Sequence, residues 1–118
     1  MTYNKNSTRY YSGRQEKKVA KIIGGKTTAN SGATTFSVGD VESDNILIEC
    51  KTCKTEKQSF AIKKDWLDKL EEEAFSVNKQ YYALAFNYGP DTDNYFILNE
   101  RNFKHFLDYL KSLQTNEE

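Results

Sequence analysis

The sequence predicts an α/β fold in which helices flank a mixed central sheet. Three observations predict it: three segments with helical periodicity, runs rich in β-branched and aromatic residues between them, and turn signals that separate the runs. The predicted order is helix, three strands, helix, two strands, helix, and a sheet covered by helices is the natural packing for that order. At 118 residues the chain has room for about one domain.

The first half of the chain is expected to form a helix and three strands. Ser12 and Gln15 make a capping-box pattern at the start of the helix, and Gly24 and Gly25 end it. The residues before Ser12 are polar and without periodicity, so we expect a flexible arm there. The predicted elements are an arm over 1–11, a helix over 12–23, an extended segment over 26–29, and strands over 36–41 and 46–51.

The second half is expected to form two helices with two strands between them. Ile62, Trp66 and Leu70 recur every four residues, which indicates an amphipathic helix, and the acidic run 71–73 is expected on its solvated face. Aromatic and β-branched residues favour the two strands. The predicted elements are a helix over 63–78, strands over 81–88 and 95–98, and a helix over 100–113 with Phe103, Phe106, Leu107, Leu110 and Leu113 on one face.

The net charge is zero, but the charges are unevenly distributed. Residues 1–26 carry seven basic side chains and one acid, whereas residues 27–118 carry ten basic and sixteen acidic side chains, so the two parts have charges of +6 and −6. Local positive charge attracts phosphates, which favours contact with DNA; a solubilising tail is the alternative. The basic residues expected to contact DNA, including two after residue 51, are Arg9, Arg14, Lys17, Lys26, Lys54 and Lys57.

No segment has the pattern of a targeting or membrane-spanning sequence. The N-terminal stretch MTYNKNSTRYYSG has no apolar region, and no stretch approaches the roughly 18 apolar residues of a membrane helix. We therefore expect a cytoplasmic protein.

Cys50 and Cys53 form the pattern C-K-T-C, which raises zinc and redox interpretations. Zinc needs about four ligands, and the only histidine, His105, lies in the last predicted helix. Redox pairs usually open a helix, whereas Cys50 lies within a predicted strand. Cys50 is therefore expected to be a small core residue, with both thiols reduced in the cytoplasm.

The stretch SVGDVESDNILIECKTC, residues 37–53, carries the candidate chemistry. Side chains in a strand alternate between its faces, so Glu49 and Lys51 should emerge on the same face. A tight turn over 42–45 would bring Asp40 beside Glu49.

Two converging carboxylates suit a hard cation such as Mg²⁺, which prefers oxygen ligands. Lys51 could hold an attacking water or stabilise developing negative charge. A surface hairpin with an ordinary Glu and Lys side by side is the alternative. Asp44 is a rival acid, but its position in a turn explains it without a function.

Through these residues the sequence resembles the PD-(D/E)XK nuclease superfamily. Asp40, followed by Glu49-Cys50-Lys51, is similar to its D…(D/E)-x-K core, although Gly39 stands where the name-giving proline would be. The resemblance implies a restriction-endonuclease-like αβββαβ core within a single nuclease domain over 12–118. It also implies an enzyme that hydrolyses phosphodiester bonds in DNA with Mg²⁺, for which Mn²⁺ can substitute.

Within the superfamily, the chain is most similar to the archaeal-type Holliday-junction resolvases, whose pattern adds a helical acid and a Ser-Gly pair. Glu16 and Ser31-Gly32 match these two features. The resemblance implies a homodimer that cuts four-way junctions in DNA recombination and repair. A nuclease for another DNA substrate and a non-catalytic DNA-binding module of the same fold are the alternatives. The implied roles are metal binding for Asp40, Glu49 and Glu16, assistance to the attacking water for Lys51, and a place near the scissile phosphate for Ser31.

Overall fold

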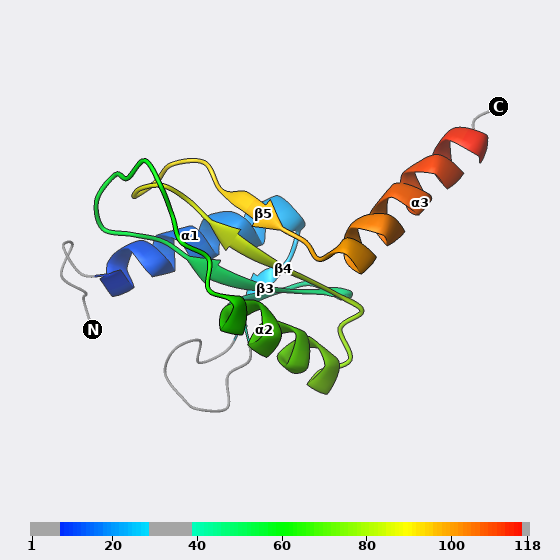
Figure 1. The fold of residues 1–118 in the computed structure, drawn as a ribbon, viewed down its shortest axis with the longest axis horizontal. Helices are drawn as coiled ribbons and strands as arrows, with labels where there is room; N and C mark the ends of the chain where they lie inside the picture. Colours follow the sequence, from blue (N-terminus) through cyan, green and yellow to red (C-terminus); the bar gives the residue numbers. More distant parts are fainter. Residues whose placement is uncertain (1–7, 29–38, 117–118) are drawn as a thin grey trace.

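A computed structural model describes residues 8–28 and 39–116, which form one mixed sheet with helices on both faces (Figure 1). The order of elements along the chain is the predicted one. Ser31, the rest of its loop and most of the strand expected over 36–41 lie outside the described residues. The elements are α1 (Thr8–Ile23), β1 (Lys26–Thr27), β2 (Val41–Glu42), β3 (Ile46–Lys51), α2 (Lys64–Ser76), β4 (Tyr81–Phe86), β5 (Tyr95–Ile97) and α3 (Glu100–Asn116).

The strands follow one another across the sheet in the order β1-β2-β3-β4-β5. Neighbouring strands are antiparallel except for the central pair, β3 and β4, which run parallel. A parallel pair needs a long crossover connection, and α2 provides it. Strand β3 has the predicted bounds and lies in the middle of the sheet, so its side chains can be covered on both faces.

Each face of the sheet has its own apolar core. Ile48 and Cys50 of β3 pack with Val19 of α1, whereas Leu47 of the same strand packs with Leu70 of α2. The alternation predicted for this strand is therefore confirmed. Glu49 and Lys51 share a face with Leu47 and therefore lie on the α2 side. Because a helix covers this face, both side chains are partly buried.

Three sequence-based expectations are wrong in detail. Helix α1 begins at Thr8, so it includes the last four residues of the expected arm, and Ser12 lies inside the helix instead of capping it. Strand β2 begins at Val41, after Asp40. The acidic run of α2 is not wholly solvated, because Glu73 is turned toward the sheet and is mostly buried.

Helix α3 projects away from the rest of the molecule (Figure 1). Among its described side chains, Asn102 is buried and all the others are exposed. The predicted apolar stripe is present but does not pack on the sheet. No helix in the described part of the chain is long and apolar enough to span a membrane.

Candidate active site

A tight turn before β2 places Asp40. Gly39 adopts a φ of +62°, which lies in the left-handed region, and a Cβ there would come within 2.6 Å of the buried Leu47 side chain. Proline is restricted to a φ of about −65° and cannot adopt this conformation. Proline could therefore not replace Gly39 without changing the backbone at this position.

Two backbone contacts hold Asp40 against β3. Its amide donates a hydrogen bond to the Ile48 carbonyl over 2.9 Å, and its Oδ2 accepts one from the Cys50 amide over 2.8 Å. The carboxyl group of Asp40 also shares a hydrogen bond with that of Glu49. The hairpin thus brings together the two carboxylates that its short turn predicts to be neighbours.

The environment of Glu49 favours its protonated form. Burial is the main cause, the charge of Asp40 adds to it, and the charge of Lys51 opposes it. A hydrogen bond that protonated Glu49 donates to Asp40 and the charge of Glu73 also favour the protonated form, and together these effects raise the pKa of Glu49 to about 8. Near neutral pH the Asp40–Glu49 pair therefore holds a proton when no cation is bound. Two adjacent carboxyl groups of this kind favour the binding of a positively charged ion.

Lys51 lies beside this carboxyl pair and against an aromatic ring. Its Nζ is 3.7 Å from Glu49 Oε1 and 4.4 Å from the centroid of the Trp66 ring, while Lys63 approaches the same ring at 5.7 Å. A cation over the face of an indole ring is attracted by the ring's electrons. Trp66 thus restrains the ammonium group next to the carboxylates, a role beyond the core position that the helical periodicity assigned to it.

Glu73 belongs to this site, although the sequence suggested that it was solvated. Its Oε2 accepts a hydrogen bond from the Gly39 amide over 3.0 Å, and its charge contributes to the raised pKa of Glu49. One signal could have found it, since it follows the buried Leu70 by three residues and precedes the buried Ala74. That spacing puts its side chain on the face of α2 that packs against the sheet.

Gln15 is a second residue that the sequence interpretation missed. Its side-chain amide is buried and donates hydrogen bonds to the Lys51 carbonyl over 2.8 Å and to Asn94 Oδ1 over 3.0 Å. Asn94 also accepts a bond from the Asn87 side chain. Gln15 therefore supports the backbone at the end of β3 instead of capping α1.

Glu16 approaches β3 from the opposite face of the sheet. It is buried, and its Oε2 lies 3.8 Å from Arg9 Nη1. Its charge is also close enough to the Cys50 thiol to raise the pKa of that thiol. Burial, and then the charges of Asp40, Glu16 and Glu49, raise the pKa of Cys50 well above its usual range. The thiol is thus neutral at physiological pH, which fits the predicted core role; Cys50 and Cys53 are both free and buried.

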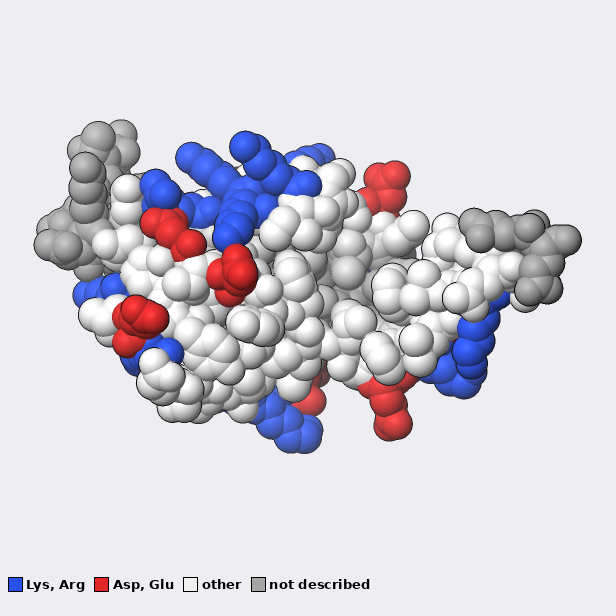
Figure 2. Space-filling view, turned by 90° about the horizontal axis from the view of Figure 1, so that it is seen from above, with Lys and Arg blue, Asp and Glu red and all other residues white. Residues whose placement is uncertain are grey.

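The basic residues predicted to contact DNA are spread over several elements. Figure 2 shows Lys and Arg side chains gathered along the edge of the molecule that α1 forms. Arg14 is paired with Asp91 over 2.7 Å, and Lys26 lies 3.9 Å from Glu42. The side chains of Lys17 on α1, and of Lys54 and Lys57 between β3 and α2, are exposed to solvent.

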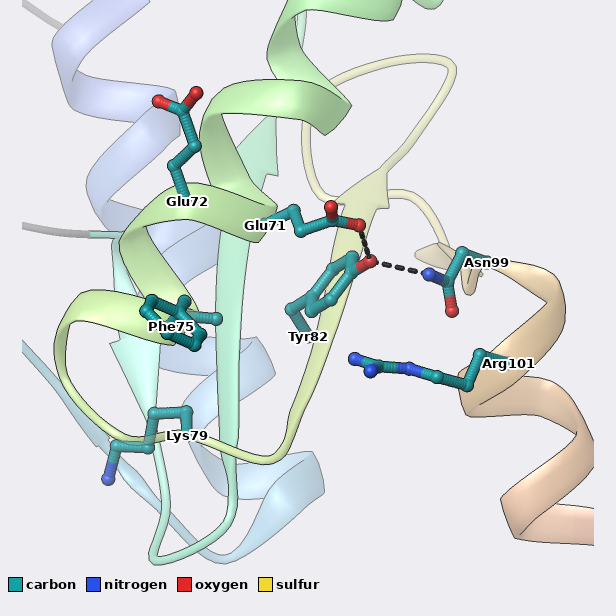
Figure 3. A pocket seen from close by; sticks show the side chains of 8 residues that line it. Glu71, Glu72, Phe75, Lys79, Tyr82, Asn99 and Arg101 are labelled. Carbon is teal, nitrogen blue, oxygen red and sulfur yellow. Dashed lines mark hydrogen bonds between the residues drawn. The ribbon is translucent and has the colours of Figure 1, made fainter.

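A separate cavity of about 530 Å³ lies between α2, β4 and the start of α3 (Figure 3). The hydroxyl of Tyr82 donates a hydrogen bond to Glu71 and accepts one from the Asn99 side chain. Burial, and then Glu71, raise the pKa of Tyr82 to about 12, so the hydroxyl keeps its proton. Because this group joins three elements, it fixes the position at which α3 begins.

The donor set at the hairpin fits a hard divalent cation. In the part of the chain that the structure describes, no group of three or more His, Cys, Asp or Glu side chains is arranged to hold a metal ion. Magnesium, however, is commonly bound by one or two carboxylates together with waters and substrate phosphate. Asp40 and Glu49 supply such a pair on an ordered hairpin.

Comparisons of the chain with protein-family models, with curated protein sequences and with solved structures found no match.

Proposed function

We propose that the protein is a magnesium-dependent DNA endonuclease of the PD-(D/E)XK type, most like a Holliday-junction resolvase. The observation that supports this proposal is the group formed by Asp40, Glu49 and Lys51 at the β2–β3 hairpin. An ordinary surface hairpin would leave these side chains in solvent. Here they are partly buried and adjacent, which costs free energy and suggests a function.

The proposed reaction is hydrolysis of a phosphodiester bond. The oxygen of water forms a bond to phosphorus and the water gives up one proton, while the bond from phosphorus to one sugar oxygen breaks and that sugar oxygen takes up one proton. Asp40 and Glu49 would hold magnesium, which when bound lowers the pKa of water and offsets phosphate charge. The ammonium group of Lys51 can donate hydrogen bonds to the attacking water or to a phosphate oxygen.

The proposal also gives roles to two further residues, Glu16 and Ser31, and to a second copy of the chain. Glu16 approaches β3 from the face opposite Glu49, so it would complete the surroundings of the metal only through water. Ser31 would lie near the scissile phosphate. A four-way junction needs two incisions in strands of like polarity, and each chain supplies one site. The proposal therefore includes a cytoplasmic homodimer whose two-fold symmetry matches that of the junction.

The test compares labelled four-way, forked and linear DNA, each with magnesium and with a chelator. Asp40→Asn and Glu49→Gln should lower the cleavage rate at least about a hundredfold, because each removes a ligand charge needed in the transition state. Binding to DNA should persist, since it depends mainly on phosphate contacts. Asp44→Asn is the matched control, because this acid lies exposed in the turn of the same hairpin.

Different outcomes separate the alternatives. Cleavage of the four-way junction alone supports the resolvase assignment, and equal cleavage of all three substrates leaves only the broader nuclease assignment. Binding without cleavage under any metal condition would favour a non-catalytic DNA-binding module. Full activity in Asp40→Asn would remove the proposed site.

A further inference from the structure

We infer that two copies of this chain associate through an apolar surface centred on α3. We call it the α3 surface; it consists of the apolar stripe of α3 together with Ile22, Phe96 and Tyr109. The inference goes beyond the nuclease proposal by naming the interface. It rests on the homodimer of that proposal, but association can be tested apart from cleavage, because it is measured without DNA or metal.

Helix α3 leaves most of its surface exposed to solvent. This helix has 17 residues and a clear apolar face, yet Asn102 is the one buried side chain among those described in it. In proteins most of the stability of an amphipathic helix comes from burial of its apolar face. The helix projects from the molecule (Figure 1) with that face uncovered.

A groove beside α3 extends the same surface. Helix α1 packs over β1, β2 and β3, whereas α2 packs on the other face of β3 and β4, so the α1 side of β4 and β5 lacks an extensive helix contact within the described residues. A groove of about 820 Å³ lies there, lined by Ile48 and Ala83 from the strands, by Leu98 just after β5, and by Phe106 and Tyr109 from α3. Nearly all of its lining is apolar or aromatic.

The exposed area matches what one partner contributes to a stable interface. The eight side chains of the α3 surface are 37–60% exposed. Since large side chains of this kind offer about 150–250 Å² each, the surface presents roughly 600–900 Å² of mainly apolar area. A specific interface needs about 800 Å² per partner, and the largest patch on a typical monomer is about 300–600 Å².

The shape of this surface suits a second copy in particular. It presents a ridge, the stripe of α3, directly beside a groove, so a two-fold arrangement can place the ridge of each copy against the groove and helix of the other. The opposite side of α3 is charged, with Lys104 and Asp108 paired over 2.9 Å, and would remain in solvent. On the face shown in Figure 2, the projecting end of the molecule is largely free of charged side chains, and those that are visible lie at its edges.

The start of α3 is held firmly enough to orient the helix before a partner binds. The buried Asn102 accepts a hydrogen bond from the Tyr82 amide over 2.9 Å, and Asn99 binds the hydroxyl of the same residue (Figure 3). Because the helix direction is already set, association costs less conformational entropy. The projecting helix is therefore preorganised as an interface.

The test measures the mass of the full chain by light scattering and analytical ultracentrifugation, with a chelator and without DNA. The wild type should have twice the mass of the 13.7 kDa chain. Phe106→Glu and Leu110→Glu should each shift it to the monomer mass, because a charge would be buried in the contact. Ser112→Glu is the matched control: it adds the same charge to the opposite face of the same helix and should remain dimeric.

Circular dichroism and urea unfolding identify a variant that fails to fold. A Leu107→Ala variant gives a second measurement, since it should weaken association at least about tenfold without introducing a charge. A wild type that stays monomeric at high micromolar concentration would overturn the inference, as would a dimer that tolerates Phe106→Glu and Leu110→Glu. A monomeric wild type would also argue against the homodimer of the resolvase proposal, whereas the substitutions of Asp40 and Glu49 test cleavage itself separately.

Discussion

Strand β3 and helix α3 depart in opposite ways from the usual distribution of side chains. Strand β3 lies between two helices and keeps charged residues, Glu49 and Lys51, in a partly buried place. Helix α3 lies in solvent and keeps large apolar residues exposed. A buried charged group and an exposed apolar patch are both informative departures from the usual distribution of side chains. Here they suggest different functions: chemistry at β3 and association at α3.

The most direct test of whether the partly buried charges of β3 carry chemistry is a substitution of Lys51. Replacing it with methionine should lower DNA cleavage at least about a hundredfold, because the ammonium group next to the carboxylates is lost. Lys63→Met is the control, since Lys63 contacts the same Trp66 ring but is not paired with Glu49. Single-turnover cleavage with magnesium makes the measurement. A Lys51→Met enzyme as fast as the control would mean that β3 carries no chemistry.

A second test concerns the one buried side chain described in α3. Asn102→Ala would leave the Tyr82 amide without its partner, and we expect the free energy of unfolding to fall by about 1–3 kcal/mol. Ser112→Ala on the exposed side should stay within about 0.5 kcal/mol of the wild type. Urea unfolding measures both variants. Similar small losses in the two would mean that the start of α3 is not anchored as described.

The pH dependence of the free energy of unfolding tests the burial of Glu49 on β3. The pKa of folded Glu49 is raised to about 8, from 4.5 when unperturbed, so the folded state retains a proton that the unfolded state loses in this range. The contribution to stability is full below about pH 4.5 and is lost as the pH rises through about 8.

Glu49→Gln removes this titration. With a chelator present, the difference in unfolding free energy between this variant and the wild type should change by at least about 1 kcal/mol from pH 5 to pH 8.5, in favour of the variant at high pH. Urea unfolding at several pH values gives the two profiles. Parallel profiles would show that Glu49 titrates as an ordinary surface acid.

The smallest effect is expected on α1. Because this helix begins at Thr8, deleting residues 1–11 would remove its first turn, so a substitution is the cleaner test. Lys17→Gln should reduce the slope of DNA affinity against salt by about one if Lys17 contacts a phosphate. Lys111→Gln on α3 should leave the slope unchanged. Equal slopes for wild type and Lys17→Gln would place the DNA contact elsewhere.

Much of the fold could be predicted from the sequence, because its signals are local. The alternating pattern over 46–51 predicted the correct bounds of β3. The four-residue spacing of Ile62, Trp66 and Leu70 predicted α2 to within two residues. The neighbourhood of Asp40 and Glu49 was also predictable, since a short turn joins them. A short turn fixes register with few alternatives.

Other members of the site depend on contacts between distant segments. Glu73 reaches the Gly39 amide across 34 residues, and Gln15 reaches the Lys51 carbonyl across 36. Periodicity shows which face of a helix is apolar, but not which backbone amide a polar residue at the border of that face will meet. The acidic run 71–73 therefore looked solvated, although its last member supports the candidate site.

By itself, the sequence determined the order of elements, the alternation within β3 and the apolar stripe of α3, because each follows from the spacing of residues along one segment. The tertiary structure decided that α1 and α2 cover both faces of β3, which buries Glu49 and raises its pKa. It also decided that α3 leaves the sheet, since hydrogen bonds to Tyr82 fix only the start of this helix. Burial depends on what packs against a residue, and spacing along the chain does not specify that partner.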